Sequence, residues 1–193
     1  MLELSVFKFA VDLFEKFIKG VREAGKDRRE KFERTCKPLF ENLEPIANEY
    51  FLTVEEAIRG LKKPNANLDD LFDNIAKRRA AIVIARDGIV GQADAFKGSF
   101  GEFADKDEYA RHALAFADAV SSYFTDAGSA ILGGPRTAIR GLLTEIDEVR
   151  NSHFTDENEL SQQMRDLIKR AENRLEMLQS KWKEVARHYK ALQ

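Results

Sequence analysis

A chain of 193 residues, 44% hydrophobic and 33% charged, carries enough apolar side chain to bury the core of one domain, which favours an ordered, helix-rich globular protein over a disordered one. Its 31 basic and 33 acidic residues give a net charge of −2, without the overall positive charge expected of a dedicated nucleic-acid-binding protein. The single cysteine, Cys36, excludes an internal disulfide. With no secretory signal and no membrane-length apolar run, we expect a cytoplasmic protein.

Residues 2–21 predict a strongly amphipathic helix. Most of its apolar side chains, including Phe7, Phe14 and Phe17, share one arc of about 200° on a helical wheel. Acidic and basic side chains nearly balance each other on the opposite side. Glycines weaken the end of this helix and predict a break before residue 26. The pattern leaves open whether residues 2–24 belong to the core, contact a partner or form a separable appendage.

Residues 27–63 continue the helical pattern across two prolines. Apolar side chains recur at Phe32, Cys36, Phe40, Leu43, Ala47, Phe51, Val54, Ile58 and Leu61. Pro38 and Pro45 each lack a backbone donor and crowd the carbonyl four residues earlier. We therefore expect a proline-kinked helix, or two segments that meet near residues 37–44.

The next predicted helix opens at Asn67, a favourable N-cap, with Asp69 and Asp70 in the first turn. Its apolar pattern continues to Phe96. Residues 80–85 are apolar on every side, so a buried strand is the alternative there. The Gly-Ser-Phe-Gly stretch at 98–101 predicts a loop.

Three further helices complete the predicted fold. An alanine-rich helix covers residues 106–127, and a Gly-Gly-Pro hinge at 133–135 precedes a short helix that ends near 150. Asp156 and Glu159 resemble a capping box that opens the last helix, over residues 156–193. Its apolar side chains form one seam at Leu160, Met164, Leu167, Ala171, Leu175, Leu178, Trp182, Val185, Tyr189 and Leu192.

These elements predict an all-α protein, a helical bundle of about six helices. Its distinguishing elements are a long C-terminal helix and a proline-kinked second helix, and residues 1–193 form a single domain.

Candidate catalytic and metal-binding groups are scattered along the sequence. His112 and His188 each follow a glutamate by four residues, which favours ion pairing over the spacing of di-iron or zinc sites, and His153 stands alone. Cys36 has basic neighbours but lies on an apolar helix face, which indicates a buried thiol. We expect no metal and no cofactor.

Two basic stretches of the sequence are candidates for binding an anion. The Lys-Arg-Arg run at 77–79, with Lys62 and Lys63 before it, is interpreted as a solvated face, in which Arg79 pairs with Asp73 or Asp87. The Gly-Gly-Pro-Arg-Thr stretch at 133–137 lacks the lysine of a phosphate-binding loop, so it predicts an interhelical turn.

The sequence therefore favours a helical protein–protein interaction or adaptor protein without intrinsic catalysis. The partner is a second protein or a second copy of the chain, bound through large apolar anchors at Phe7, Phe14, Phe17 and Trp182. One alternative is a peripheral membrane protein that uses residues 2–21. Another is a ligand-binding or enzymatic bundle. No specific nucleic acid is expected.

Overall fold

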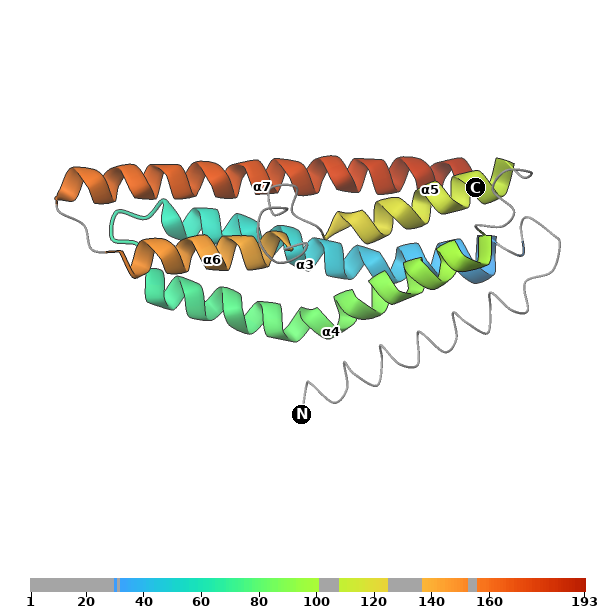
Figure 1. Ribbon diagram of the computed structural model, residues 1–193, viewed down its shortest axis with the longest axis horizontal. Helices are drawn as coiled ribbons and strands as arrows, with labels where there is room; N and C mark the ends of the chain where they lie inside the picture. The colour runs from blue at the N-terminus through green and yellow to red at the C-terminus, as the bar shows by residue number, and fades with distance from the viewer. Residues whose placement is uncertain (1–29, 31, 101–107, 125–136, 153–155) are drawn as a thin grey trace. The chain divides into compact units, whose positions relative to one another are not determined.

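The computed structural model describes residues 30, 32–100, 108–124, 137–152 and 156–193. Within these ranges the chain is all-helical and forms no β-strand, which confirms the predicted fold class (Figure 1). The predicted helix over residues 2–24, with Phe7, Phe14 and Phe17, lies outside the described residues. So do the hinge at 133–135 and His153.

The described chain forms one π-helix and five α-helices. Their bounds are η1 Phe32–Cys36, α3 Lys37–Leu61, α4 Leu68–Phe100, α5 Glu108–Tyr123, α6 Ala138–Arg150 and α7 Glu157–Leu192. The wider π-helical turn changes to α-helix at Lys37, immediately before Pro38, which has no N–H to donate. From there α3 continues through Pro45 as one helix to Leu61. None of the described helices combines the length and apolar character needed to cross a lipid bilayer.

Helix α4 is longer than the sequence predicted. Residues 80–85 are helical, so the alternative of a buried strand is wrong there. Residues 98–100, predicted as a loop, form the last turn of the same helix. One glycine inside a helix costs only about 1 kcal/mol, and burial of Ile89, Ala93 and Phe96 outweighs that cost.

Two predicted helix caps are confirmed. The Asn67 side-chain oxygen accepts hydrogen bonds from the backbone N–H groups of Asp69 and Asp70 at 3.1 and 3.2 Å. The Asn67 amide in turn donates to the Asp70 carboxylate at 2.8 Å. At the start of α7, the backbone N–H of Glu159 donates to Asp156 at 2.8 Å. These bonds satisfy donors that have no partner inside the helix.

The described residues cluster into two compact units, each with its own core. Unit 1 comprises the described parts of Met1–Ala47, Ala81–Phe124 and Ser180–Gln193. Unit 2 comprises those of Asn48–Ala80 and Thr125–Gln179. Helices α3, α4 and α7 therefore each contribute to both units.

Unit 1 packs the small face of α5 against its neighbours. That face is almost completely buried at Ala110, Ala113, Ala117 and Val120. Figure 1 shows α5 beside the C-terminal end of α7, where the Lys181 ammonium donates to the Ser122 carbonyl at 2.6 Å. Small side chains of this kind let two helices approach closely.

An aromatic cluster joins α3, α5 and α7 within unit 1. The rings of Phe40 and Tyr189 stack with centroids 4.0 Å apart and an interplanar angle of 8°. The Trp182 ring also stacks on Phe40, with centroids 5.4 Å apart, and forms an edge-on pair with Tyr123 at a centroid distance of 6.0 Å. The centroids of the Phe116 and Tyr189 rings lie 5.8 Å apart. Aromatic pairs of this kind stabilise a core beyond the area that they bury.

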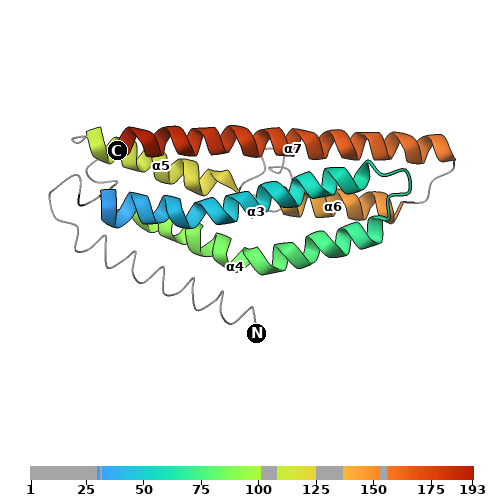
Figure 2. The ribbon, with the colours of Figure 1, turned by 180° about the vertical axis from the view of Figure 1, so that it is seen from behind.

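Unit 2 is held together by apolar packing and a few partly buried ion pairs. Helix α6 lies partly behind α3 in Figure 2, and it contacts α7 where Arg174 donates two hydrogen bonds of 2.7 Å to the Glu145 carboxylate. The Arg150 guanidinium lies 4.2 Å from the centre of the Phe72 ring and 3.3 Å from Asp69. This arginine therefore links the end of α6 to the start of α4.

The predicted seam of α7 is buried along most of the helix. Four of its side chains lie seven residues apart and are fully or almost fully buried: Ala171, Leu178, Val185 and Leu192. Leu160, in the first turn, is the exception and is 40% exposed. The prediction of one continuous C-terminal helix with a single apolar seam is confirmed.

Candidate functional site

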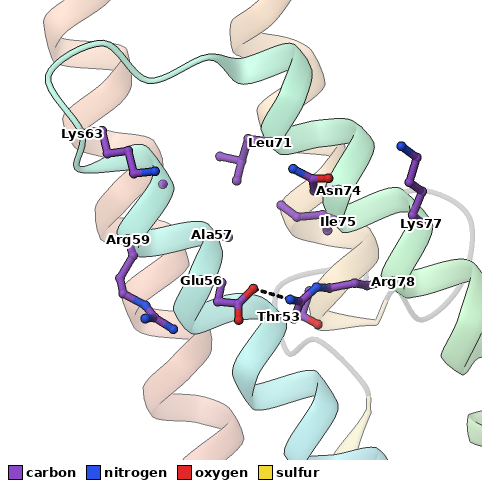
Figure 3. A pocket seen from close by; sticks show the side chains of 11 residues that line it. Thr53, Glu56, Ala57, Arg59, Lys63, Leu71, Asn74, Ile75, Lys77 and Arg78 are labelled. Atoms are coloured by element: carbon purple, nitrogen blue, oxygen red, sulfur yellow. Dashed lines mark ion pairs between the residues drawn. The ribbon is translucent and has the colours of Figure 1, made fainter.

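A pocket of about 690 Å³ lies between the end of α3 and the start of α4, entirely within unit 2 (Figure 3). Residues 62–67 connect the two helices at one end of the pocket, and an ion pair between Glu56 and Arg78 spans them at the other. The lining residues are Thr53, Glu56, Ala57, Arg59, Gly60, Lys63, Leu71, Asn74, Ile75, Lys77 and Arg78. The volume falls within the range of sites that bind small molecules or a few partner side chains.

The floor of the pocket is apolar. Ala57 and Ile75 are buried, and the half-buried Leu71 extends from α4 towards α3 (Figure 3). Gly60 makes room for it, because a Cβ atom at this position would lie only 3.0 Å from the Leu71 Cδ1 atom. An apolar side chain from a ligand can therefore exclude water from this floor.

The rim of the pocket is strongly basic. Four lining side chains are cationic, at Arg59, Lys63, Lys77 and Arg78, against the single carboxylate of Glu56. Lys63 and Lys77 are exposed and form no ion pair with another described residue, and Arg59 reaches Glu55 only at 3.9 Å. Cations gathered around a low-dielectric floor concentrate positive potential and attract anionic groups.

Arg78 is the one cation of the pocket held by close acidic neighbours. Its Nη2 atom lies 2.5 Å from Glu56, and its Nη1 atom lies 3.5 Å from Glu49. All three side chains remain between 36% and 45% exposed. Ion pairs with this much solvent contact contribute only about 0–1 kcal/mol, so an external anion can compete for the arginine.

The pocket brings together two basic stretches that the sequence showed separately. Lys63 follows α3, whereas Lys77 and Arg78 lie in the third turn of α4. Lys62, the residue before Lys63, instead forms an ion pair of 2.6 Å with Glu172 of α7. The sequence alone indicates a solvated face for the run at 77–79. Nothing local in the sequence shows that the turn at 62–67 brings the two basic stretches side by side.

The predicted pairing of Arg79 with Asp73 or Asp87 is not found in the described structure. Asp87 instead accepts a hydrogen bond of 2.9 Å from Arg86. The Nε atom of Arg79 is buried and has no hydrogen-bond partner among the residues that the structure describes. The preceding residue, Arg78, makes the acidic contacts, because it is the one that faces α3.

Trp182 is the one predicted interaction residue within the described structure. It belongs to the aromatic cluster of unit 1 and is half-buried against Phe40 and Tyr123. It is not part of the α3–α4 pocket, which lies in unit 2. Its role as an interaction anchor stays a prediction.

Two histidines form the local contacts that their spacing predicted. The Nε2 atom of His112 lies 3.8 Å from Glu108, and that of His188 lies 3.9 Å from Glu184. Burial, with Arg187 close by, lowers the pKa of His188. In the parts of the chain that the structure describes, no three His, Cys, Asp or Glu side chains gather as a metal site would require.

Cys36 is a fully buried thiol of unit 1, as its place on the apolar helix face predicted. Its sulfur lies 3.5 Å from the Tyr109 hydroxyl and 3.7 Å from that of Thr35. Burial raises the pKa of the thiol, which keeps it protonated and unreactive at neutral pH. The contact with Tyr109 could not be found from the sequence, because 73 residues separate the two side chains.

The fold and the site define an all-helical protein with an exposed basic pocket between two helices. No protein-family model, curated protein sequence or solved structure matches this chain.

Proposed function

We propose that this protein acts without intrinsic catalysis by binding a partner protein, and that the partner engages the α3–α4 pocket. The observation that carries the proposal is the combination of a buried apolar floor with an exposed charged rim. Protein interfaces commonly place one apolar anchor in such a pocket and surround it with polar contacts.

A small anionic ligand is the alternative occupant of the same pocket. The volume of about 690 Å³ suits it, but the lining lysines are exposed and no element covers them in the described structure. A small ligand at such a site keeps much of its surface in water. A partner protein brings its own surface to cover the rim, which favours the protein partner.

Site-specific photocrosslinking in the native cells tests the proposal. A photoreactive amino acid replaces Asn74, which lines the pocket, and in a control it replaces Asn173, an exposed residue of α7 in the same unit. We expect a discrete adduct with one protein from position 74 only. That protein, purified, should bind the unmodified full chain in calorimetry. Identical adducts from both positions, or a purified candidate that does not bind, would refute the proposal.

The proposal includes finer features predicted from the sequence. Residues 2–24 form a sixth helix of the bundle, and Phe7, Phe14, Phe17 and Trp182 provide further anchors for a partner or for self-association. Light scattering at high concentration tests self-association, which a strict monomer would contradict. Helix α3 is kinked at its prolines, and residual dipolar couplings along it should report two axis directions instead of one.

Peripheral membrane binding through residues 2–21 is the competing function, based on the amphipathic arc of that segment. It requires that the full chain sediments with liposomes and that Phe14→Glu abolishes the effect. Absence of co-sedimentation, or co-sedimentation unchanged by Phe14→Glu, would remove this alternative.

A further inference from the structure

We infer that the partner segment bound by the α3–α4 pocket is acidic, and that Glu56 occupies the position that a partner carboxylate takes against Arg78. The inference rests on the proposed function, because it specifies the chemistry of the partner that the pocket binds. It makes Glu56 a specificity-determining residue of the site.

Charge complementarity identifies the partner as acidic. Four cationic side chains and one carboxylate line the pocket, and two of those cations, Lys63 and Lys77, form no ion pair among the described residues. A basic or neutral segment would leave these ammonium groups partly desolvated without a counter-charge, which is costly. An acidic segment neutralises them at the rim.

The floor adds a second requirement for the partner. Ala57 and Ile75 present buried apolar surface, and Leu71 narrows the space above it. A segment that inserts one apolar side chain between its carboxylates matches both the floor and the rim. We therefore expect an acidic segment with an apolar anchor.

In the free protein, Glu56 already forms with Arg78 the ion pair that we infer for the partner carboxylate. Its oxygen lies 2.5 Å from Arg78, yet its side chain is 45% exposed and can rotate into water. A partner carboxylate that takes its place exchanges one ion pair for another. Glu56 then remains at the rim as the one like charge that the partner meets, so it opposes binding.

Fluorescence anisotropy with the full chain tests the inference. The probe is a labelled 12-residue peptide of glutamate, alanine and one central leucine. A control peptide carries glutamine in place of every glutamate. Titrations use the unmodified protein, Glu56→Gln, Lys77→Gln, and Glu148→Gln as a matched control. Glu148 is an exposed residue of α6 in the same unit, so the control changes the net charge equally without touching the pocket.

We expect the glutamate peptide to bind and the glutamine peptide not to bind. Glu56→Gln should tighten binding by roughly 3- to 10-fold and Lys77→Gln should weaken it by roughly 3-fold or more, both effects shrinking at high salt. Glu148→Gln should leave the affinity unchanged. Equal binding of the two peptides, or equal effects of Glu56→Gln and Glu148→Gln, would overturn the inference.

Two further outcomes separate this inference from the proposed function. If the crosslinked partner binds the full chain but Lys77→Gln and Glu56→Gln leave its affinity unchanged, the pocket binds a protein and the acidic chemistry is wrong. If citrate displaces the peptide at an affinity equal to that of the peptide itself, the site binds small anions. That result would overturn the inference and the proposed function together.

Discussion

Glu145 shows how a charged side chain is accommodated within unit 2. It is only 17% exposed and accepts both hydrogen bonds from Arg174, which is 11% exposed, while Arg170 approaches to 3.2 Å. Removing the carboxylate leaves two arginines near each other without their counter-charge. Because these groups are largely withdrawn from water, the loss exceeds that of a surface ion pair.

We predict that Glu145→Ala lowers the free energy of unfolding by about 2–3 kcal/mol, as expected for breaking a largely buried charge pair. Urea unfolding followed by circular dichroism provides the measurement. Glu148→Ala, an exposed change on the same helix, should stay within about 0.5 kcal/mol of the unmodified protein. Equal effects of the two substitutions would contradict the prediction.

His188 predicts a loss of stability in mild acid. Burial, the like charge of Arg187 and the nearby His112 all lower its pKa from the ordinary 6.5, and Glu184 only partly opposes them. Between the lowered pKa and 6.5, the unfolded chain therefore binds more protons than the folded protein does. The contribution of neutral His188 is complete above pH 6.5 and is lost as the pH falls through that window.

We predict that His188→Gln makes the free energy of unfolding depend less steeply on pH below 6.5. The measurement is a series of urea titrations from pH 8 to pH 5 on both proteins. Values at pH 8 serve as the reference, because His188 is neutral there in the folded and unfolded chain. Parallel pH profiles for the two proteins would show that His188 does not contribute.

At the scale of elements, the caps decide where the helices begin. Asn67 satisfies two backbone donors of α4 and also binds the Asp70 carboxylate. We predict that Asn67→Ala destabilises the protein by about 1 kcal/mol, whereas Asn65→Ala, two residues earlier and exposed, has little effect. Thermal unfolding of the two variants compares them directly. If both lose the same stability, the turn as a whole and not the cap is responsible.

The helices themselves were largely predictable from the sequence, because their signals are local. The seam of α7 and the caps at Asn67 and Asp156 each depend on residues a few positions apart, and all are found in the structure. The end of α4 was not predictable in the same way. Glycines at 98 and 101 indicated a loop, but the helix extends to residue 100.

The basic residues of the candidate site could be found in the sequence, but their arrangement in space could not. The sequence showed the basic run at 77–79 and the lysines before it, but it gave no spacing between helices. The pairing of Arg78 with Glu49 and Glu56 depends on how the turn at 62–67 sets α4 against α3. Contacts across a turn of this kind are set by three-dimensional packing and leave no periodic pattern in the chain.

At the scale of the molecule, the two units share three helices. Since α3, α4 and α7 each run through both, loss of helix in one unit removes the continuation of helices in the other. We predict that Glu145→Ala, a change in unit 2, lowers the unfolding midpoint reported by Trp182 fluorescence in unit 1 as much as that reported by circular dichroism. An unchanged fluorescence midpoint would show that the units unfold independently.

The same division of the chain affects the order in which the protein can fold during synthesis. The aromatic cluster of unit 1 joins Phe40, near the start of α3, to Trp182 and Tyr189, near the end of α7. While the ribosome is still translating α7, Phe40 and the apolar face of α5 have no partner from that helix. Apolar surface on Phe40 and α5 therefore stays uncovered until α7 emerges, and we expect molecular chaperones to bind the nascent chain during that interval.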